Sequence, residues 1–303
     1  MKRGLVGLGM VLALVACGGD DPADPGSGGS GTGTPSGTGG GVGTGGGGTG
    51  GNPAGPDPPF LPAPPGACPA FTAGTNTFAP AGLPSRNVEI WVGDDPTAQD
   101  GPLVFYWHGT GSSPVQEPPY GLEQVIAQVT DAGGVVAAPH SDPGSGQFPW
   151  FLTTGGSRDD DLRVADEVLA CAMENVGIDT TRIHSIGMSA GGLQTTQMSY
   201  WRSGYIASIV AYSGGLLGAA PEMPDPNNKF AAMILHGGPN DTVIVNFQDL
   251  SEAYRADLQG RGHFAFICDH GQGHTIPKND NAQAAIGEFF AAHPYGTTPS
   301  PYA

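Results

Sequence analysis

The sequence Gly187-Met-Ser-Ala-Gly191 constrains the fold of this 303-residue chain more than any other stretch. It has the form G-x-S-x-G, in which a serine sits on a sharp turn from a strand into a helix and the glycines let the turn close. Residues 182–186 are typical of a short strand, and 193–201 can form a helix. Glycine accounts for 52 residues, so the alternative is a chance match in a glycine-rich loop. The flanking strand and helix favour the motif, which makes Ser189 the candidate nucleophile.

The first 66 residues read as a leader followed by a linker. Residues 1–16 begin with two basic residues, continue as an apolar run and end in small residues before Cys17, which resembles a bacterial lipoprotein signal. Residues 17–66 are rich in Gly, Ser, Thr and Pro and cannot bury enough apolar area to become ordered. We therefore expect a lipid on Cys17 and a disordered linker. The alternative is ordinary secretory cleavage with an unmodified Cys17.

Composition narrows the possible partners of the folded part, residues 67–297. Over the whole chain, 28 acidic residues outnumber 11 basic ones, and no basic stripe occurs, which argues against nucleic acid or an anionic membrane surface as a partner. We expect a monomer outside the cytoplasm that touches a membrane only through its lipid, at the outer membrane or cell surface, or secreted. Three cysteines, Cys68, Cys171 and Cys268, suggest one disulfide and one free thiol, and the sequence leaves their pairing open.

Strand and helix signals alternate through the folded part, which predicts an α/β fold with a mostly parallel, doubly wound sheet in a single domain. The run 101–107 is almost continuously apolar, as expected for a strand covered on both faces. The expected strands are 75–79, 87–93, 101–107, 134–139, 182–186, 206–212, 230–236 and 263–268, and the expected helices are 120–132, 159–176, 193–201, 247–258 and 281–292.

Candidate partners of Ser189 follow the last two strands. Asp241 comes shortly after strand 230–236, where a triad acid must lie to orient a histidine, although an aspartate there can also serve as a turn or helix-capping residue. After strand 263–268, His274 is favoured over His270 because it stands farther along a loop beside Gly273, and His293 ranks third. The order Ser, Asp, His is that of the α/β-hydrolase fold.

Two further elements bear on catalysis. His108-Gly-Thr-Gly111 follows strand 101–107, where a glycine-rich loop supplies one oxyanion donor in such folds, or else forms only a tight turn. We expect the N–H groups of Thr110 and Ala190 to form the oxyanion hole. The loop 141–157 carries several aromatic residues, of which Trp150 could line the substrate cleft or simply belong to the core.

These motifs resemble those of secreted esterases grouped with polyhydroxybutyrate depolymerases, feruloyl esterases and acetyl xylan esterases, over residues 67–295. The resemblance rests on residues 177–192, His108-Gly109 and 268–275. It implies an α/β hydrolase that cleaves carboxylic esters, with a possibly polymeric substrate, Ser189 as nucleophile, His274 as base and Asp241 as its orienting acid. Two positions differ from the family pattern: Ile276 stands where depolymerase-like members often have Trp, and the segment from His236 to Asp241 is one residue longer.

Other functions remain open at this point. The reaction needs no organic cofactor or metal, and the one H-x-x-x-H pattern, His270 with His274, lies in a glycine-rich loop that would not place both rings on one helix face. A hydrolase-fold surface lipoprotein that only binds a ligand is the main alternative, because a long tether suits display as well as catalysis. A secreted peptidase would use the same triad.

Replacing Cys17 by Ser tests the expected lipid anchor. The variant should move from the detergent phase to the soluble phase in partitioning experiments, because the thiol that would carry the lipid is gone. Ester hydrolysis per molecule should stay unchanged. A variant still held at the membrane would show that the anchor is not this cysteine.

Overall fold

The computed structural model describes residues 56–63, 68–95, 100–152, 158–277 and 280–303. The expected leader, Cys17 and most of the expected linker lie outside these residues. Within the described part, none of the helices combines the length and the apolar composition needed to cross a membrane.

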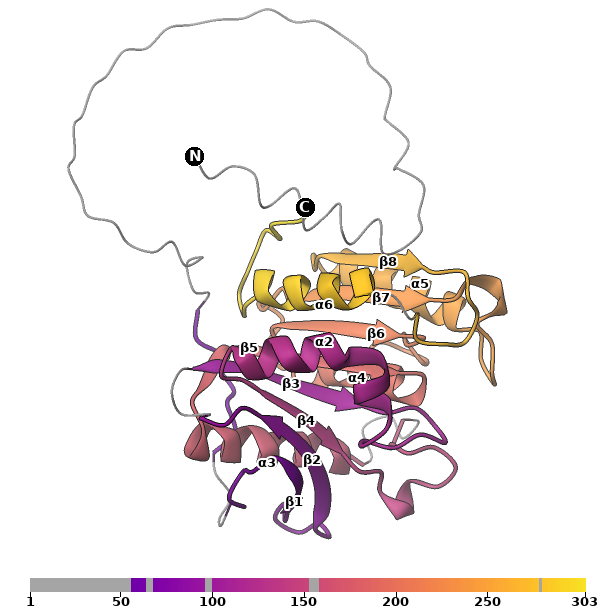
Figure 1. Ribbon diagram of the computed structural model, residues 1–303. Coiled ribbons are helices and arrows are strands. Elements are labelled where there is room, and N and C mark those ends of the chain that lie inside the picture. Colours follow the sequence, from indigo (N-terminus) through magenta and orange to yellow (C-terminus); the bar gives the residue numbers. More distant parts are fainter. Residues whose placement is uncertain (1–55, 64–67, 96–99, 153–157, 278–279) are drawn as a thin grey trace, which may run out of the picture.

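The described chain is built on one eight-stranded sheet with the order β1-β2-β4-β3-β5-β6-β7-β8 (Figure 1). The pairs β1–β2 and β2–β4 are antiparallel, and the remaining neighbours are parallel. The strands are β1 (Gly74–Phe78), β2 (Arg86–Val92), β3 (Gly101–Trp107), β4 (Val135–Pro139), β5 (Ile178–Met188), β6 (Ser208–Tyr212), β7 (Ala231–His236) and β8 (Ala265–Asp269).

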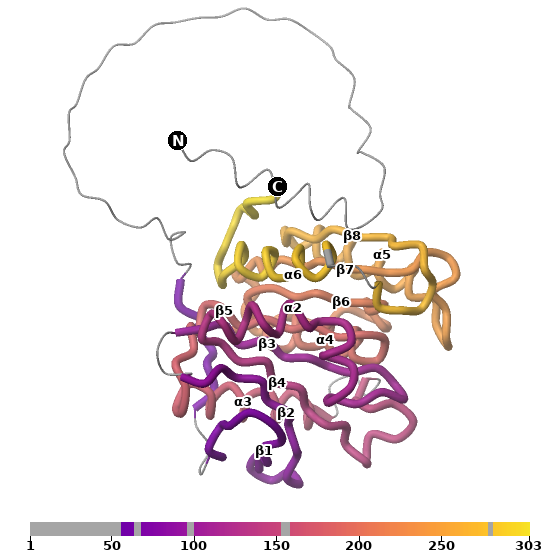
Figure 2. Tube along the Cα trace, viewed as in Figure 1, coloured from indigo at the N-terminus to yellow at the C-terminus, as the bar shows by residue number. Residues whose placement is uncertain are grey.

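Helices cover both faces of the sheet and enclose two cores. Helices α2 and α6 lie together on one face, and α3, α4 and α5 pack on the other, as Figures 1 and 2 show. Successive side chains of β3 alternate between the cores: Phe105 belongs to one and Tyr106 to the other. The helices are α2 (Glu117–Asp131), α3 (Asp160–Asn175), α4 (Ala190–Trp201), α5 (Phe247–Gly260) and α6 (Asp280–Ala292).

The expected elements are all present, and three of their boundaries differ by three residues or more. Helix α2 begins three residues earlier than expected, because Pro118 and Pro119 fit the first helical turn, where no N–H is needed. Strand β5 extends back to Ile178, and α4 begins directly after Ser189, with glycines in its first turn. The predicted α/β class with a mostly parallel, doubly wound sheet is confirmed.

A disulfide joins Cys68, which precedes β1, to the fully buried Cys171 in α3. The bond closes a loop with a sequence separation of 103 residues. In the chain-entropy model, a loop of that length stabilises the fold by roughly 5 kcal/mol. The described residues contain no free cysteine, so the expectation of one free thiol is wrong.

Candidate active site

The turn that carries Ser189 is sharp and strained. Strand β5 ends at Met188 and α4 begins at Ala190, which leaves Ser189 alone between them with φ 58° and ψ −119°. Such angles in a non-glycine residue cost about 1–3 kcal/mol and persist only where surrounding contacts enforce them. Here the Ser189 N–H donates to the carbonyl of Tyr212 at 2.9 Å, and the Ser189 carbonyl accepts from the Leu193 N–H at 2.9 Å.

Close approach of the backbone explains the glycines of the motif. A Cβ atom on Gly191 would lie 1.7 Å from the carbonyl oxygen of Trp107, and one on Gly187 would lie 2.4 Å from the carbonyl oxygen of Gly191. Both obstacles are backbone atoms, which cannot rotate away. The motif therefore lets α4 start directly against the end of β3.

The three predicted triad residues lie in one hydrogen-bonded line. His274 Nε2 is 2.9 Å from Ser189 Oγ, and His274 Nδ1 is 2.6 Å from Asp241 Oδ1. The His274 ring also stacks on Phe247, with 4.8 Å between ring centroids. The geometry is that of a nucleophile, a base and an acid that fixes the base.

Asp241 is fully buried, and its second carboxylate oxygen is satisfied as well. Oδ2 accepts hydrogen bonds from Ser213 Oγ at 2.8 Å and from the Gly237 N–H at 2.9 Å. Burial acts to raise the pKa of Asp241, but the bonds from His274, Gly237 and Ser213 outweigh it and lower the pKa below its ordinary value. The carboxylate is therefore ionised and holds the proton on His274 Nδ1, which leaves Nε2 to accept the proton of Ser189.

The other candidate histidines take structural roles. His293 is buried, with Nδ1 bonded to the Phe289 carbonyl and Nε2 to Ser300 Oγ. The backbone N–H of His270 donates to the His236 carbonyl, and burial lowers the pKa of its side chain. Among the described residues, no group of three or more His, Cys, Asp or Glu side chains is placed to hold a metal ion.

Two backbone N–H groups are placed to bind an oxyanion. Ala190 is the first residue of α4, so its N–H lies at the positive end of a helix. Thr110 is exposed in the loop after β3. Neither N–H has a hydrogen-bond acceptor among the described residues. By contrast, the N–H of Gly109 is already bonded to the carboxylate of Glu117.

Sequence reasoning missed two residues of this site, Glu117 and Ser213. Ser213 directly follows β6 and has a positive φ of 43°. Its position one residue beyond a strand next to β5 is a signal that could have found it. The acidic residue just before Pro118-Pro119 marks a helix start, and that signal could have placed Glu117 beside the oxyanion loop.

Trp150 does not line a cleft. Its side chain is 1% exposed, and its indole Nε1 donates to the His108 carbonyl at 2.9 Å. The ring packs edge-on against Trp107 at 5.0 Å between centroids. This corrects the expectation that Trp150 contacts substrate. The ring is in the core because burying its large apolar surface is more favourable than exposing it, and its indole N–H supports the oxyanion loop from the interior of the protein.

A groove of about 800 Å³ runs along α4. It begins at Leu193, one turn after Ser189, and continues past Gln197 to Trp201 near the end of the helix. The opposite wall is the segment 215–222, which follows β6, and most of the lining is apolar. The groove therefore offers an elongated apolar surface close to the nucleophile.

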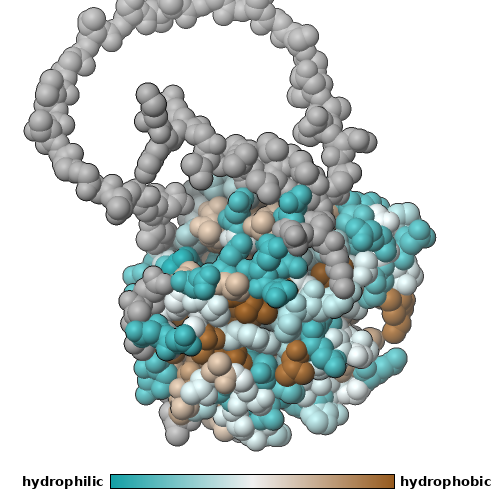
Figure 3. All heavy atoms as spheres, in the orientation of Figure 1, coloured by the Kyte–Doolittle hydropathy of each residue, from teal (hydrophilic) through white to brown (hydrophobic). Residues whose placement is uncertain are grey.

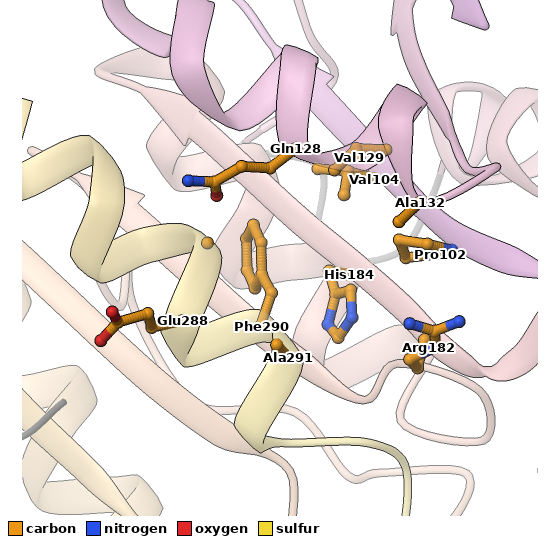
Figure 4. A pocket seen from close by; sticks show the side chains of 11 residues that line it. Pro102, Val104, Gln128, Val129, Ala132, Arg182, His184, Glu288, Phe290 and Ala291 are labelled. Atoms are coloured by element: carbon orange, nitrogen blue, oxygen red, sulfur yellow. The ribbon is translucent and has the colours of Figure 1, made fainter. Parts of the chain in front are cut away.

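A smaller pocket of about 300 Å³ lies between α2 and α6 and contains no triad residue (Figure 4). His184 and Phe290 stack face to face in it at 4.6 Å between ring centroids. Burial lowers the pKa of His184 to about 3, so its ring is neutral. This pocket is remote from the chemistry of Ser189.

The fold occurs in known esterases. The chain is similar to a solved structure of a protein named pOPH, with a TM-score of 0.63 and 18% identity over 77% of this chain and 92% of that one. The chain has the α/β-hydrolase fold. It is also similar to a thermostable esterase, with a TM-score of 0.53 and 21% identity over 72% of this chain and 62% of that one. A third similar structure is the propionate-bound esterase Est2 of Thermogutta terrifontis, with a TM-score of 0.53 and 16% identity over 73% of this chain and 92% of that one.

Esterase 2 of Thermogutta terrifontis is also known in a form phosphonylated by cyclosarin, which matches this chain with a TM-score of 0.52 and 17% identity over 72% of this chain and 90% of that one. No protein-family model and no curated protein matches the sequence. At these identities the likeness establishes the fold, and the activity depends on the residues of the site itself.

Replacing Gly191 by Ala tests the close packing at the nucleophile turn. The added methyl group has no space beside the Trp107 carbonyl, so we expect a large loss of stability, or no folded protein, in thermal unfolding followed by circular dichroism. Gly260→Ala is the matched control, because nothing lies within 4 Å of the added atom at the exposed end of α5. It should keep or slightly raise the stability. A Gly191→Ala protein as stable as wild type would contradict this account.

Proposed function

We propose that this protein is a serine hydrolase that cleaves carboxylic esters. The observation that carries the proposal is the continuous hydrogen-bonded line from Ser189 through His274 to the buried Asp241. Support also comes from the esterases among the proteins of similar fold, one of which is phosphonylated by cyclosarin.

The geometry supports a two-stage acyl transfer. His274 takes the proton of Ser189 as Oγ attacks the ester carbonyl, and the negative oxygen that forms is held by the N–H groups of Thr110 and Ala190. The proton then passes from His274 to the leaving alcohol, which departs and leaves an acyl group on Ser189. In the second stage His274 activates water, which attacks the acyl group and releases the acid and the free serine. Asp241 stays ionised and stabilises the imidazolium in both stages.

Replacing Ser189 by Ala should lower kcat for a short p-nitrophenyl ester by at least about three powers of ten, because the triad acts as a unit. A fluorophosphonate probe should label wild type at Ser189 and leave the variant unlabelled. Folded wild type that takes up no probe would favour the alternative, a hydrolase-fold lipoprotein that only binds a ligand. Undiminished ester hydrolysis by the variant would exclude Ser189 as the nucleophile.

We propose an apolar polymeric ester, such as an aliphatic polyester, as the substrate rather than a feruloylated or acetylated polysaccharide. Five of the six exposed large hydrophobic side chains in the described part lie in the segments that follow β3, β6 or β7, at the same sheet edge as Ser189; four are in loops, and Tyr120 is in the first turn of α2. They are Val115, Tyr120, Leu217, Val243 and Ile244. Figure 3 shows hydrophobic side chains protruding at the edge toward which the parallel strands point in Figure 1. A rim of this kind suits an insoluble apolar surface.

The double replacement Val243→Ser with Ile244→Ser tests the rim. These side chains are 52% and 70% exposed, so the variant should fold normally and hydrolyse a soluble p-nitrophenyl ester at the wild-type rate. Its rate on suspended polyhydroxybutyrate particles should fall several-fold, because adsorption depends on exposed apolar area. Phe60→Ser is the control, since Phe60 is 55% exposed but lies beside Gly204, beyond the far end of α4. Equal rates on particles for all three proteins would refute the rim, and faster hydrolysis of acetylated xylan than of polyester would refute the substrate class.

For the location, we propose that residues 1–16 are removed and that a lipid on Cys17 holds the catalytic domain, residues 67–297, outside the cytoplasm. The support is the sequence pattern of the leader and the Gly- and Pro-rich composition of residues 17–66. A flexible chain of that kind spans about 5–6 Å times the square root of its length. Such a reach would let an anchored enzyme work on a substrate beside the cell.

A further inference from the structure

Glu117 lies in the active site without belonging to the triad. It is the first residue of α2, immediately before two prolines, and its side chain is partly buried under the loop that follows β3. Its carboxylate accepts hydrogen bonds from the Tyr106 hydroxyl, 2.9 Å from Oε1, and from the Gly109 N–H, 3.0 Å from Oε1 and 3.2 Å from Oε2. The placement of this partly buried carboxylate against a backbone N–H of the oxyanion loop requires a functional explanation.

Gly109 lies between this carboxylate and the nucleophile. A Cβ atom built on Gly109 would be 3.4 Å from Glu117 Oε2 and 3.4 Å from Ser189 Cβ. The Gly109 N–H belongs to the peptide that links His108 to Gly109, so Glu117 holds that peptide beside Ser189. Fixing the Gly109 N–H also limits rotation of the following peptide, which carries the Thr110 N–H. The orientation of that donor thus depends on Glu117 together with the Ser112 N–H, which donates to the Gly109 carbonyl at 3.2 Å.

The charge of Glu117 also acts on the catalytic histidine. Burial raises the pKa of Glu117, and hydrogen bonds from Tyr106, Ser112 and the Gly109 N–H, together with the charge of His274, counteract part of that rise. The titratable groups around this carboxylate are Tyr106 and His274, and Tyr106 in turn faces Tyr212. His274 thus interacts with two carboxylates: Asp241 is bonded directly to it, and Glu117 acts through space.

We propose that Glu117 is a positioning residue for ester hydrolysis, with two effects: it aims the Thr110 N–H at the oxyanion, and its negative charge stabilises the imidazolium of His274. This assignment rests on the proposed function, since both effects presuppose that Ser189 attacks a carbonyl. It gives α2 a role in the chemistry beyond packing, because the helix begins at the residue that holds the oxyanion loop.

Two replacements separate the effects. Glu117→Ala removes both the acceptor and the charge, so kcat should fall about 10- to 100-fold with little change in KM, somewhat less than the loss of a whole oxyanion donor. Glu117→Gln keeps an oxygen in place of Oε1 and removes only the charge. Its kcat should fall less, and the acid limb of its kcat/KM profile should move to lower pH, because the imidazolium of His274 loses a favourable negative neighbour.

Inhibition by an alkyl boronic acid is a measurement that would stay unchanged if Glu117 had only a structural role. The boronate's tetrahedral adduct on Ser189 places an oxygen in the oxyanion hole, so Glu117→Ala should weaken inhibition by about the same factor as it lowers kcat/KM. Glu123→Ala is the matched control, because it removes the same charge from an exposed position of α2. It should leave the rates, the pH profile and the boronate affinity unchanged.

Fluorophosphonate labelling distinguishes failure of this assignment from failure of the proposed function. A folded wild type that is neither labelled nor inhibited would overturn both. A wild type that is labelled, with Glu117→Ala labelled as fast and inhibited by boronate as strongly, would overturn only the role of Glu117. If Glu117→Ala does not fold, the Glu117→Gln profile decides: an acid limb at the wild-type position would refute the electrostatic effect.

Discussion

The hydrogen bond between the buried Asp241 and His274, 2.6 Å long, is the interaction on which the rest of the site depends. A carboxylate with no exposure to solvent is costly unless its oxygens are bonded, and here three donors from three segments of the chain converge on it: His274, Ser213 and the Gly237 N–H. If one of these segments moved, a buried charge would lose a partner. The same contacts that keep Asp241 ionised thus lock the loops after β6, β7 and β8 together.

The parallel register of the sheet brings these segments to one place. Met188, Tyr212, Leu235 and Cys268 stand side by side on β5, β6, β7 and β8. The next residue on each strand therefore emerges at the same edge, where Ser189 and Ser213 lie directly beyond their strands. Gly237 comes directly after β7. The loop after β8 brings His274 back over this edge, and the Gly273 N–H in that loop donates to the Gly237 carbonyl. Catalytic groups far apart in the sequence meet because neighbouring strands end at the same level.

Much of the fold and of the candidate site could be predicted from the sequence. The residues whose roles could not be predicted depend on tertiary contacts. Ser189 and His274 were identifiable because a nucleophile turn needs particular glycines and because a histidine must follow the last strand. Trp150 was assigned to a cleft because the sequence places it in a loop, but burial of its ring is a tertiary property. Glu117 and Ser213 act through side chains whose partners, Gly109 and Asp241, lie elsewhere in the sequence, so their positions after β3 and β6 mark them as candidates but do not reveal those partners. The early start of α2 was missed because Pro118 and Pro119 read as helix breakers outside the first turn.

The two carboxylates beside His274 have opposite effects on stability. The pKa of Asp241 is lowered in the folded protein, so its ionisation stabilises the fold above the pKa it has when unfolded, and that stability is lost as the pH falls through the folded value. The pKa of Glu117 is raised, so holding it ionised at neutral pH destabilises the fold, and acidification through the raised pKa relieves that cost. Glu117 is retained although its ionisation lowers the stability of the fold, and it is bonded to the Gly109 N–H beside the nucleophile. This is expected where a residue is selected for catalysis at some cost to stability. The difference between the two residues is consistent with the proposed positioning role of Glu117, whereas the ionised Asp241 also stabilises the fold.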